Sequence, residues 1–369
     1  MLWFCAGTAG ELIKLYPLLR LAEKRGLAWT FVSTGQSAVN FWTQWDDFQL
    51  SRSKAVTLID TTHDLTRSTQ ALAWWLRCVT LGLKTVREKL RQATGALPLP
   101  SDHWVVHGDT LSTLAGAILG RRLGVPIAHV EAGLRSSSLL SPFPEEINRR
   151  LVSRLTSRHF GQDQRAVENL RQASGLVLNT RGNTLYDALM AVIEDPAFAK
   201  TGDLPEGRYA VANLHRFENL NSATRWEAHC QTLLTAASQM PTYLVLHPPT
   251  QAKLEGDPTT KKRLESGGVK LLPRQPFTRF TRLMEGAEFL LSDGGSNQEE
   301  CYYLGKPCLL LRDTTERVEG LDGGPCVLSK FEAPAIAGFL KDPAQFKRDP
   351  VRFDRSPSEL ILDSLEPKP

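Results

Sequence analysis

The sequence predicts an α/β protein with two Rossmann-like domains that face a cleft. At 369 residues the chain is longer than one typical domain. Short apolar runs alternate with helical patterns in both halves, which is typical of parallel, doubly wound sheets. We expect one domain over residues 1–175 and a second over residues 176–345, hinged near residues 175–190. Residues 346–369 then form a tail that is free to pack back on the first domain.

Hydrophobic periodicity assigns the expected elements of each half. In the first half they are strand Leu2–Ala6, helix Glu11–Arg25, strand Trp29–Ser33, one long helix or two over Leu65–Leu97, strand–helix–strand over Trp104–Val130, and helix Glu145–Thr156. A further strand is expected near Leu176–Thr180 and a helix after the turn at Gly182–Thr184. In the second half the expected strands are Tyr209–Ala212, Thr242–Leu246, Val269–Leu272, Glu288–Leu291 and Cys308–Leu311.

Composition and charge exclude several classes of partner. The chain is 41% hydrophobic and 23% charged, as in an ordinary globular protein. Its net charge of +4 does not favour nucleic acid or a membrane surface but suits a small anionic ligand. The six cysteines form no CxxC pair, which favours a reducing compartment. We therefore expect a cytoplasmic protein with no membrane span, no metal and no cofactor.

The stretch His107–Arg150 is the most informative part of the chain, because it holds the carboxylates Asp109, Glu131, Glu145 and Glu146. Strand-like runs precede Asp109 and Glu131, and the helix-length segment between them predicts adjacent parallel strands. Both acids are then expected at strand carboxyl ends, where open α/β sheets bind ligands. Clustered carboxylates repel one another and raise at least one pKa, as acid/base chemistry requires. The alternative is a set of solvated loop acids and helix N-caps.

A second ligand-binding segment is expected at the turn Gly294-Gly295-Ser296 in the C-terminal half. A strand precedes this turn and a helix follows it, so free backbone N–H groups are available to phosphate. Glu300, farther along the helix, is a candidate partner for ribose hydroxyls.

Two histidines and one aromatic residue are further candidates. His215 and His247 each follow a predicted strand, where a histidine suits a phosphate or sugar but is about as often structural. Phe280 precedes the strand that leads into the turn. From periodicity alone it is a core residue, and stacking on a base is the alternative.

Together these segments resemble the UDP-N-acetylglucosamine 2-epimerases, the non-hydrolysing bacterial type in particular. The resemblance covers roughly residues 4–345. In chain order the matching motifs are GTAGELIK (7–14), HGDT (107–110), HVEAGLR (129–135), SPFPEEINRR (141–150), GNTLYDAL (182–189), HRFEN (215–219), HPP (247–249), SDGGSNQEE (292–300) and LGKPCLLLRDTTERVEG (304–320). HVEAGLR, SPFPEEINR and RDTTER are the most specific of them.

The resemblance implies a GT-B-like arrangement and assigns roles in the first half. Asp109, Glu131 and Glu145 match the family's catalytic acids. Arg149 matches the arginine that accompanies them, and Lys14, in the first strand–helix turn, is expected to face the sugar nucleotide and the acids.

In the second half the resemblance assigns the substrate contacts. His215 matches the histidine that reaches the diphosphate or sugar, and His247 falls on another histidine of the cleft. Phe280 occupies the uracil-stacking position and Glu300 that of the ribose-binding carboxylate. The resemblance also implies that several further groups contact the sugar or the diphosphate. These are Arg312, Glu316, Arg317 and the backbone of Gly294, Gly295 and Ser296.

The chain departs from the family pattern at three places. Ala9-Gly10 replace an Arg-Pro pair, so one cation beside the diphosphate is missing. Gly294 stands where the family has a serine. The family's Gly-Gln-His motif, linked to a second, activating UDP-sugar, ends here in Ser37, and its later polar partner is Val39. We therefore do not expect activation by substrate.

The expected function is that of a homodimeric enzyme that interconverts UDP-GlcNAc and UDP-ManNAc, or a related UDP-HexNAc, for surface polysaccharide synthesis. A carboxylate removes the weakly acidic C2 proton while UDP leaves C1, and the sequence does not decide which acid is the base. A GT-B glycosyltransferase or a hydrolysing 2-epimerase is the alternative, since a fold does not fix a reaction. A further alternative is a protein that binds nucleotide sugars without catalytic activity. The retained acids favour the first function, and the departures favour the alternatives.

Overall fold

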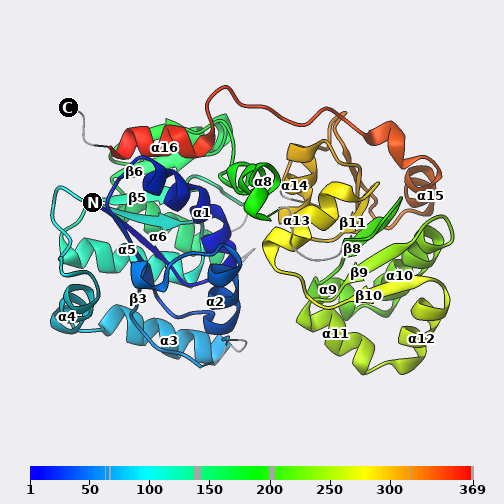
Figure 1. Ribbon diagram of the computed structural model, residues 1–369, viewed down its shortest axis with the longest axis horizontal. Coiled ribbons are helices and arrows are strands. Elements are labelled where there is room, and N and C mark those ends of the chain that lie inside the picture. Colours follow the sequence, from blue (N-terminus) through cyan, green and yellow to red (C-terminus); the bar gives the residue numbers. More distant parts are fainter. Residues whose placement is uncertain (63, 66–67, 137–142, 199–203, 316, 367–369) are drawn as a thin grey trace. The chain divides into compact units, whose positions relative to one another are not determined.

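The computed structural model describes residues 1–62, 64–65, 68–136, 143–198, 204–315 and 317–366. The chain forms two compact units, one of Met1–Ala191 with Asp354–Pro369 and one of Val192–Phe353 (Figure 1). Each unit is built on a parallel sheet with helices around it. The predicted α/β fold class is therefore confirmed.

The first unit contains a seven-stranded sheet in the order β3-β2-β1-β4-β5-β6-β7. Its strands are β1 (Leu2–Ala6), β2 (Trp29–Ser33), β3 (Ala55–Thr57), β4 (His103–His107), β5 (Ile127–Val130), β6 (Arg158–Gly161) and β7 (Leu176–Asn179). All the pairings recorded between these strands are parallel. The strand order reverses between β1 and β4. The carboxyl ends of these two strands are where such sheets bind ligands.

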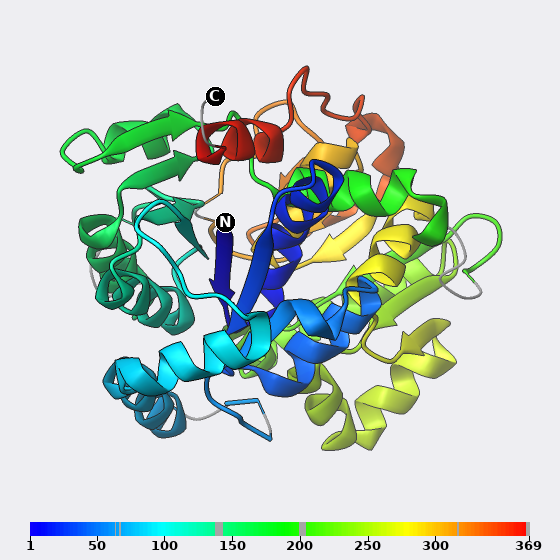
Figure 2. The same cartoon turned by 60° about the vertical axis from the view of Figure 1, so that its left-hand side comes forward.

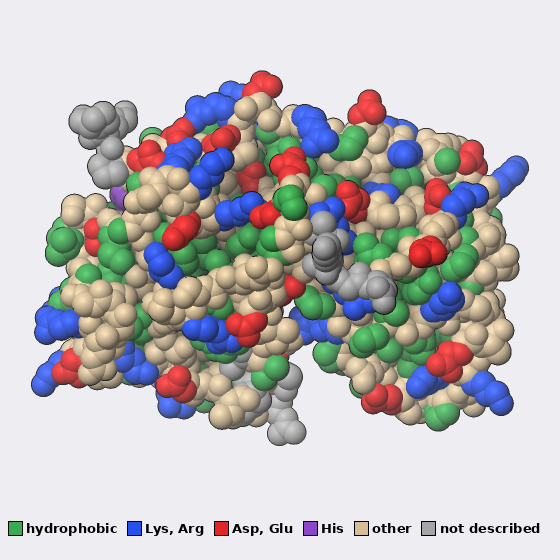
Figure 3. Space-filling view, viewed as in Figure 1, with side chains coloured by type: hydrophobic (Ala, Val, Ile, Leu, Met, Phe, Trp, Pro, Cys, Tyr) green, Lys and Arg blue, Asp and Glu red, His purple; other side chains and the backbone are tan. Residues whose placement is uncertain are grey.

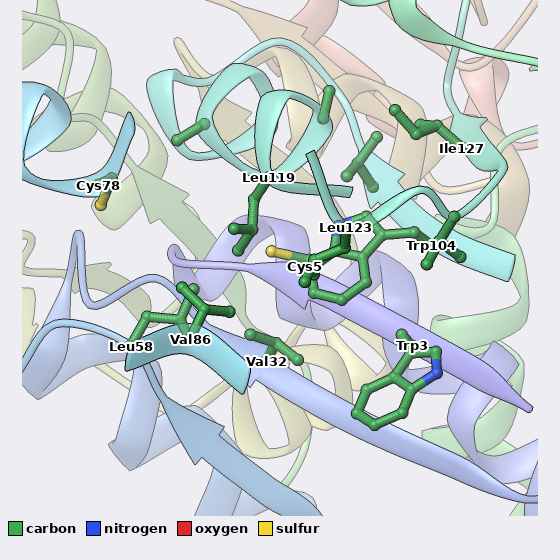
Figure 4. Close-up of a cluster of buried hydrophobic side chains, with 14 of the residues drawn as sticks. Trp3, Cys5, Val32, Leu58, Cys78, Val86, Trp104, Leu119, Leu123 and Ile127 are labelled. Atoms are coloured by element: carbon green, nitrogen blue, oxygen red, sulfur yellow. The ribbon is translucent and has the colours of Figure 1, made fainter. Parts of the chain in front are cut away.

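The helices of the first unit are α1 (Ala9–Lys24), α2 (Ala38–Asp47), α3 (Ser68–Thr80), α4 (Leu83–Thr94), α5 (Leu111–Leu123), α6 (Glu145–Leu155), α7 (Gln164–Asn169), α8 (Leu185–Glu194) and α16 (Pro357–Leu365), with a 3-10 turn η1 (Arg52–Lys54). Trp3 and Trp104 lie in the hydrophobic core between sheet and helices (Figure 4). Helix α5 approaches β4 closely because it carries Gly120, where a Cβ would lie 2.7 Å from the Trp104 ring. This contact packs the C-terminal part of α5 against the start of β4.

The C-terminal helix α16 completes the first unit by packing against α1 (Figures 1 and 2). The backbone N–H of Ser358 donates to Asp187 Oδ2 of α8 at 2.8 Å. Residues 176–191, which the sequence analysis assigns to the second domain, belong to the first unit, since β7 pairs with β6 along its whole length.

The second unit contains a six-stranded sheet in the order β10-β9-β8-β11-β12-β13. Its strands are β8 (Ala210–Asn213), β9 (Thr242–Val245), β10 (Val269–Leu272), β11 (Leu290–Ser292), β12 (Cys308–Leu310) and β13 (Cys326–Leu328). Its helices are α9 (Phe217–Leu220), α10 (Ala223–Ala237), α11 (Pro248–Glu255), α12 (Pro258–Ser266), α13 (Phe277–Gly286), α14 (Gly295–Leu304) and α15 (Ala333–Lys341), with 3-10 turns η2 (Pro196–Phe198) and η3 (Pro343–Phe346). The strand order reverses between β8 and β11, so the loops that follow these two strands flank the switch point.

The surface carries charges of both signs. Blue and red side chains are interspersed over the face seen in Figure 3, without a continuous patch of one sign on that face. Within the described ranges, no helix combines the length and the apolar character that crossing a membrane requires.

Candidate active site

The turn after β1 is anchored by a buried carboxylate, Glu11, in the first turn of α1. Glu11 accepts hydrogen bonds from the backbone N–H groups of Gly7 (3.0 Å) and Thr8 (2.9 Å). It also accepts from the hydroxyls of Thr110 (2.8 Å) and Thr113 (3.0 Å). Burial raises the pKa of Glu11, and these hydrogen bonds oppose the rise. Sequence patterns alone do not mark Glu11, which joins the turns after β1 and β4.

Lys14 and Glu131 form an ion pair at the centre of the first unit's candidate site. Lys14 lies within α1 rather than in the preceding turn, so this detail of the prediction is wrong. Its Nζ is 2.6 Å from Glu131 Oε1, and the two side chains are 11% and 8% exposed. Glu131 follows β5 with a left-handed φ of 61°. Such a backbone costs a non-glycine residue about 1–3 kcal/mol and persists only where surrounding contacts hold it.

The His107 ring contributes no positive charge beside this pair. Its Nε2 lies 3.6 Å from Glu131 Oε2, but burial lowers the pKa of His107 to about 3. Burial likewise lowers the pKa of His129 to about 4, and its Nε2 lies 2.7 Å from the carbonyl oxygen of Gly108. Both rings are therefore neutral near pH 7, and Lys14 supplies the charge that faces Glu131.

Asp109 is held by a different cation, Arg149 of α6. Arg149 Nε and Nη2 lie 2.8 and 2.7 Å from Asp109 Oδ2. The neighbouring Asn148 donates to the backbone carbonyl of Asp109 at 2.8 Å. Glu145 begins α6, and its Oε2 is buried with no hydrogen-bond partner among the described residues. Asp109 and Glu131 thus each have a cation of their own, which offsets the mutual repulsion expected from the sequence.

Glu146 positions the arginines of α6. Its side chain is fully buried, and it accepts hydrogen bonds from Arg150 Nε (2.8 Å) and the backbone N–H of Ser136 (3.0 Å). These bonds hold the pKa of Glu146 below its usual range, against the effect of burial. Arg149 Nη1 lies 3.5 Å from the same carboxylate, so Glu146 helps to orient the arginine that pairs with Asp109.

In the second unit, Asp293 ties the end of β11 to the loop after β8. Its buried carboxylate accepts from the backbone N–H groups of His215 (2.9 Å) and Arg216 (3.0 Å) and from Asn219 Nδ2 (3.1 Å). The His215 ring stacks on His247, with ring centroids 4.6 Å apart. Burial lowers the pKa of both histidines, that of His247 to about 3. The stacked rings are therefore neutral and able to donate hydrogen bonds.

The start of α14 lies beside these histidines. Gly294 is its N-cap and Gly295 its first residue, and no described side chain caps the helix. The exposed Ser296 follows in the first turn. A Cβ on Gly294 would lie 3.0 Å from His215 Cε1, so glycine lets the ring approach the helix end. Backbone N–H groups at such an open helix end are suited to an anion.

The remaining predicted residues of the second unit are mostly buried. Glu300 accepts a hydrogen bond from Asn297 Nδ2 at 2.7 Å. Arg317 pairs with the buried Glu299. Arg312 Nη1 and Arg317 Nε would lie 4.0 and 3.0 Å from a Cβ at Gly295, so both cations are near the start of α14. Phe280, in α13, is 7% exposed. Glu316 lies outside the described residues.

Each sheet reverses its strand order next to one of these clusters, which places the chain among the Rossmann-like α/β proteins that bind ligands at such switch points. Within that class, the family model for UDP-N-acetylglucosamine 2-epimerase matches residues 20–357. The chain therefore belongs to the UDP-N-acetylglucosamine 2-epimerase family, and the resemblance noted from its motifs is confirmed.

Several relatives bear names of that family. The chain is 33% identical to the UDP-N-acetylglucosamine 2-epimerase of Yersinia pestis over 280 residues, which cover 72% of this chain and 71% of the relative. It is 33% identical to a probable UDP-N-acetylglucosamine 2-epimerase of Ralstonia solanacearum over 234 residues, 60% of this chain. That match spans 61% of the relative's own length.

Solved structures extend the likeness over the whole chain. The UDP-GlcNAc 2-epimerase of Methanocaldococcus jannaschii is similar with a TM-score of 0.74 and 26% identity, covering 99% of each chain. The Neisseria meningitidis UDP-GlcNAc 2-epimerase, solved bound to UDP-GlcNAc, has a TM-score of 0.73, 26% identity and the same coverage.

Proposed function

We propose that this protein interconverts UDP-GlcNAc and UDP-ManNAc, or a closely related UDP-HexNAc, by elimination and readdition of UDP. The observation that carries this proposal is the pair of carboxylates at neighbouring strand ends. Glu131 is held by Lys14, and Asp109 is held by Arg149. Epimerisation at C2 needs one group to remove a proton from one face and another to return a proton to the other face.

The reaction balances with these residues. One carboxylate takes the C2 proton, the C2–H electron pair forms the C1=C2 double bond, and the C1–O bond breaks as UDP leaves. The second carboxyl group then protonates C2 from the opposite face while UDP adds back to C1. Asp109 and Glu131 are the proposed proton-transfer pair, with Glu145 assisting. Lys14 and Arg149 position the two acids and offset the charge that develops in the transition state.

The second unit supplies the proposed nucleotide site. The start of α14 binds the diphosphate through the backbone N–H groups of Gly295 and Ser296, since that of Gly294 already donates to Ser292 Oγ at 3.0 Å. The neutral His215 and His247 donate hydrogen bonds to it, and Arg312 and Arg317 add positive charge. We place Glu316 in the same group on the resemblance alone. Glu300 takes the ribose hydroxyls, and Phe280 stacks on the uracil.

One observation favours hydrolysis of the intermediate as a second candidate. Ala9 and Gly10 leave the first two positions of α1 without a positively charged side chain, and a Cβ at Gly10 would meet no described atom within 4 Å. With less charge to hold the departing diphosphate, water can capture the intermediate before UDP returns.

Proton NMR in D2O with purified protein and UDP-GlcNAc separates these functions. Deuterium at C2 with UDP still attached indicates epimerisation, which is the expected result. Free UDP with free N-acetylmannosamine indicates hydrolysis. No exchange at C2, with the sugar transferred and UDP released only when an acceptor is added, contradicts the proposal and points to a glycosyltransferase.

The assembly and the cellular role are also proposals. Leu72 and Leu76, 57% and 48% exposed, lie one turn apart on α3 and support a homodimer, because exposed leucines on one helix face favour self-association. Light scattering of the wild type and of the Leu72→Glu/Leu76→Glu variant tests this. The six buried, unpaired cysteines support a cytoplasmic location, and UDP-ManNAc suits surface polysaccharide synthesis.

A further inference from the structure

We propose that Asn183 is a positioning residue that holds the Glu131 carboxylate for proton transfer, an inference that rests on the proposed function. Asn183 Nδ2 lies 2.6 Å from Glu131 Oε1. The same oxygen receives Lys14 Nζ at 2.6 Å. Asn183 comes from the turn between β7 and α8, so Glu131 is held from two sides by elements distant in sequence.

The orientation of the Asn183 amide is fixed by its other contacts. Asn183 Oδ1 accepts the backbone N–H of Leu185 at 2.9 Å. Because a backbone N–H only donates, the atom that faces it must be the amide oxygen. The NH2 group therefore faces Glu131 and also donates to Gln162 Oε1 at 3.0 Å. Asn183 is 3% exposed, so this arrangement is shielded from water.

The backbone of Glu131 makes such support necessary. Its left-handed φ of 61° is unfavourable for a residue with a side chain, so contacts of the side chain must keep it in place. Lys14 supplies a charged contact and Asn183 a neutral one on the same oxygen. Glu131, Asn183, Gln162 and Ile361 of α16 line one small cavity.

The charges around Glu131 allow the contact between Asn183 and Glu131 to be tested by the pH dependence of the reaction. Among the described residues, the titratable groups that face the carboxylate include the Lys14 ammonium from α1, the neutral His107 ring from β4 and the neutral His129 ring from β5. A second carboxylate at position 183 would lie within hydrogen-bond distance of Glu131. Two carboxylates so close share a proton instead of both ionising.

The first experiment compares Asn183→Asp with the wild type by the pH dependence of deuterium exchange at C2. Aspartate keeps the size of the side chain and the acceptor for Leu185, so the start of α8 is preserved. We expect the acidic limb of the kcat profile to move up by about one pH unit or more, so that kcat falls by up to about tenfold per unit of the shift at pH values on that limb. KM should change less than about threefold.

The matched control is Asn179→Asp, since Asn179 Oδ1 accepts the Arg181 N–H at 2.8 Å and a carboxylate preserves that bond. A profile for Asn183→Asp that overlays the control overturns the proposal.

The second experiment measures the stability of the protein and does not depend on enzymatic activity. The shared proton makes Asn183→Asp less stable relative to wild type at pH 8 than at pH 5. Glu131→Gln in the Asn183→Asp background restores a donor–acceptor pair with the roles exchanged, so most of the pH 8 loss in the unfolding midpoint should be recovered. If the midpoint loss is equal at both pH values and Glu131→Gln rescues nothing, Asn183 does not hold Glu131. A wild type without C2 exchange removes the proposed function, and the unfolding cycle still decides whether the two side chains are coupled.

Discussion

At the scale of single residues, the candidate site depends on pairing each acid with its own cation. Lys14 and Glu131 are separated by 117 positions in sequence, and Asp109 and Arg149 by 40, yet both pairs form charge-assisted hydrogen bonds. Each ion pair fixes the position of its carboxyl group, which a proton-transfer residue requires. The remaining barrier must then be lowered by stabilising the departing diphosphate.

The first prediction concerns these two acids. Asp109→Asn and Glu131→Gln should each abolish C2 exchange, by at least about a thousandfold, because an amide neither takes nor returns the proton. UDP binding should stay within a few-fold of wild type. Deuterium exchange followed by NMR and calorimetric titration with UDP give both values. Exchange that survives in both variants would exclude the elimination mechanism.

Some residues of the candidate site can be predicted from the sequence, and others cannot. Asp109 and Glu131 directly follow strand-like runs, so their position at a sheet edge can be predicted. Glu11, His107 and Asn183 are recognisable only after folding, because each is an ordinary residue whose partners come from elsewhere in the chain. Asn183 reaches Glu131 across 52 positions, and no local pattern records such a contact.

At the scale of elements, many strands and helices can be predicted from the sequence, whereas some short ones cannot. The strand Val269–Leu272 is found at its predicted bounds, and residues 65–97 contain two helices, α3 and α4, one of the two possibilities expected. Strands β3 and β13 have three residues each, too few for a periodic signal, and they were not predicted. Packing of the C-terminal tail on the first domain is expected from the sequence, but its contact with α8 is not, because Ser358 and Asp187 are 171 positions apart.

The second prediction concerns the contact between α8 and α16. Burial raises the pKa of Asp187 to about 6, well above the value of about 3.9 in an unfolded chain. A folded pKa that is raised stabilises the protein below about pH 4, and this contribution is lost as the pH rises through about 6. Asp187→Asn avoids the loss while keeping an acceptor for Ser358, so it should gain about 1–3 kcal/mol relative to wild type between pH 4 and pH 7.

Urea unfolding at pH 4, 5.5 and 7 measures this gain. The buried histidines titrate in the same range with the opposite sign, but wild type and variant share them, so their contribution cancels. The control is Asp363→Asn, an exposed acid of α16 that pairs with Arg25. Parallel stability curves for wild type and Asp187→Asn would contradict the prediction.

The third prediction concerns the segment that precedes α2. Gln36 Oε1 accepts the backbone N–H of Ser112 at 3.0 Å, and Ser37 donates to Asp64 at 2.9 Å, so these polar groups bind within the unit. Val39 is 56% exposed and offers no polar contact through its side chain. Initial rates should therefore depend hyperbolically on UDP-GlcNAc. A Hill coefficient clearly above one that Gln36→Ala abolishes would show the opposite.

At the scale of the whole molecule, chemistry and nucleotide binding are assigned to different units. The acids and their cations lie in the first unit, whereas Glu300, His215 and the start of α14 lie in the second. Mutations in the two units should therefore have separable effects on turnover and on binding.

The fourth prediction tests this division. Glu300→Ala should weaken UDP binding by about 1–3 kcal/mol, because it leaves hydrogen-bonding groups unpaired, among them Asn297 Nδ2. Asp109→Asn should change UDP binding by less than about 0.5 kcal/mol, within the range usual for a substitution away from the ligand. Calorimetry with UDP measures both, with the unfolding midpoint of Glu300→Ala as a check on folding. Equal losses in the two variants would contradict the division.

The return of α16 to the first unit has a consequence for synthesis on the ribosome. A chain that emerges in order exposes residues 1–191 long before residues 354–366 are made, so the second unit can fold while the first still lacks its last helix. Until then Ile361, Leu362 and Leu365, which are buried in the finished protein, cannot cover the surface they pack against. That uncovered surface is a natural binding target for chaperones that act on nascent chains. A protein truncated just before α16 would keep it exposed permanently and is expected to aggregate.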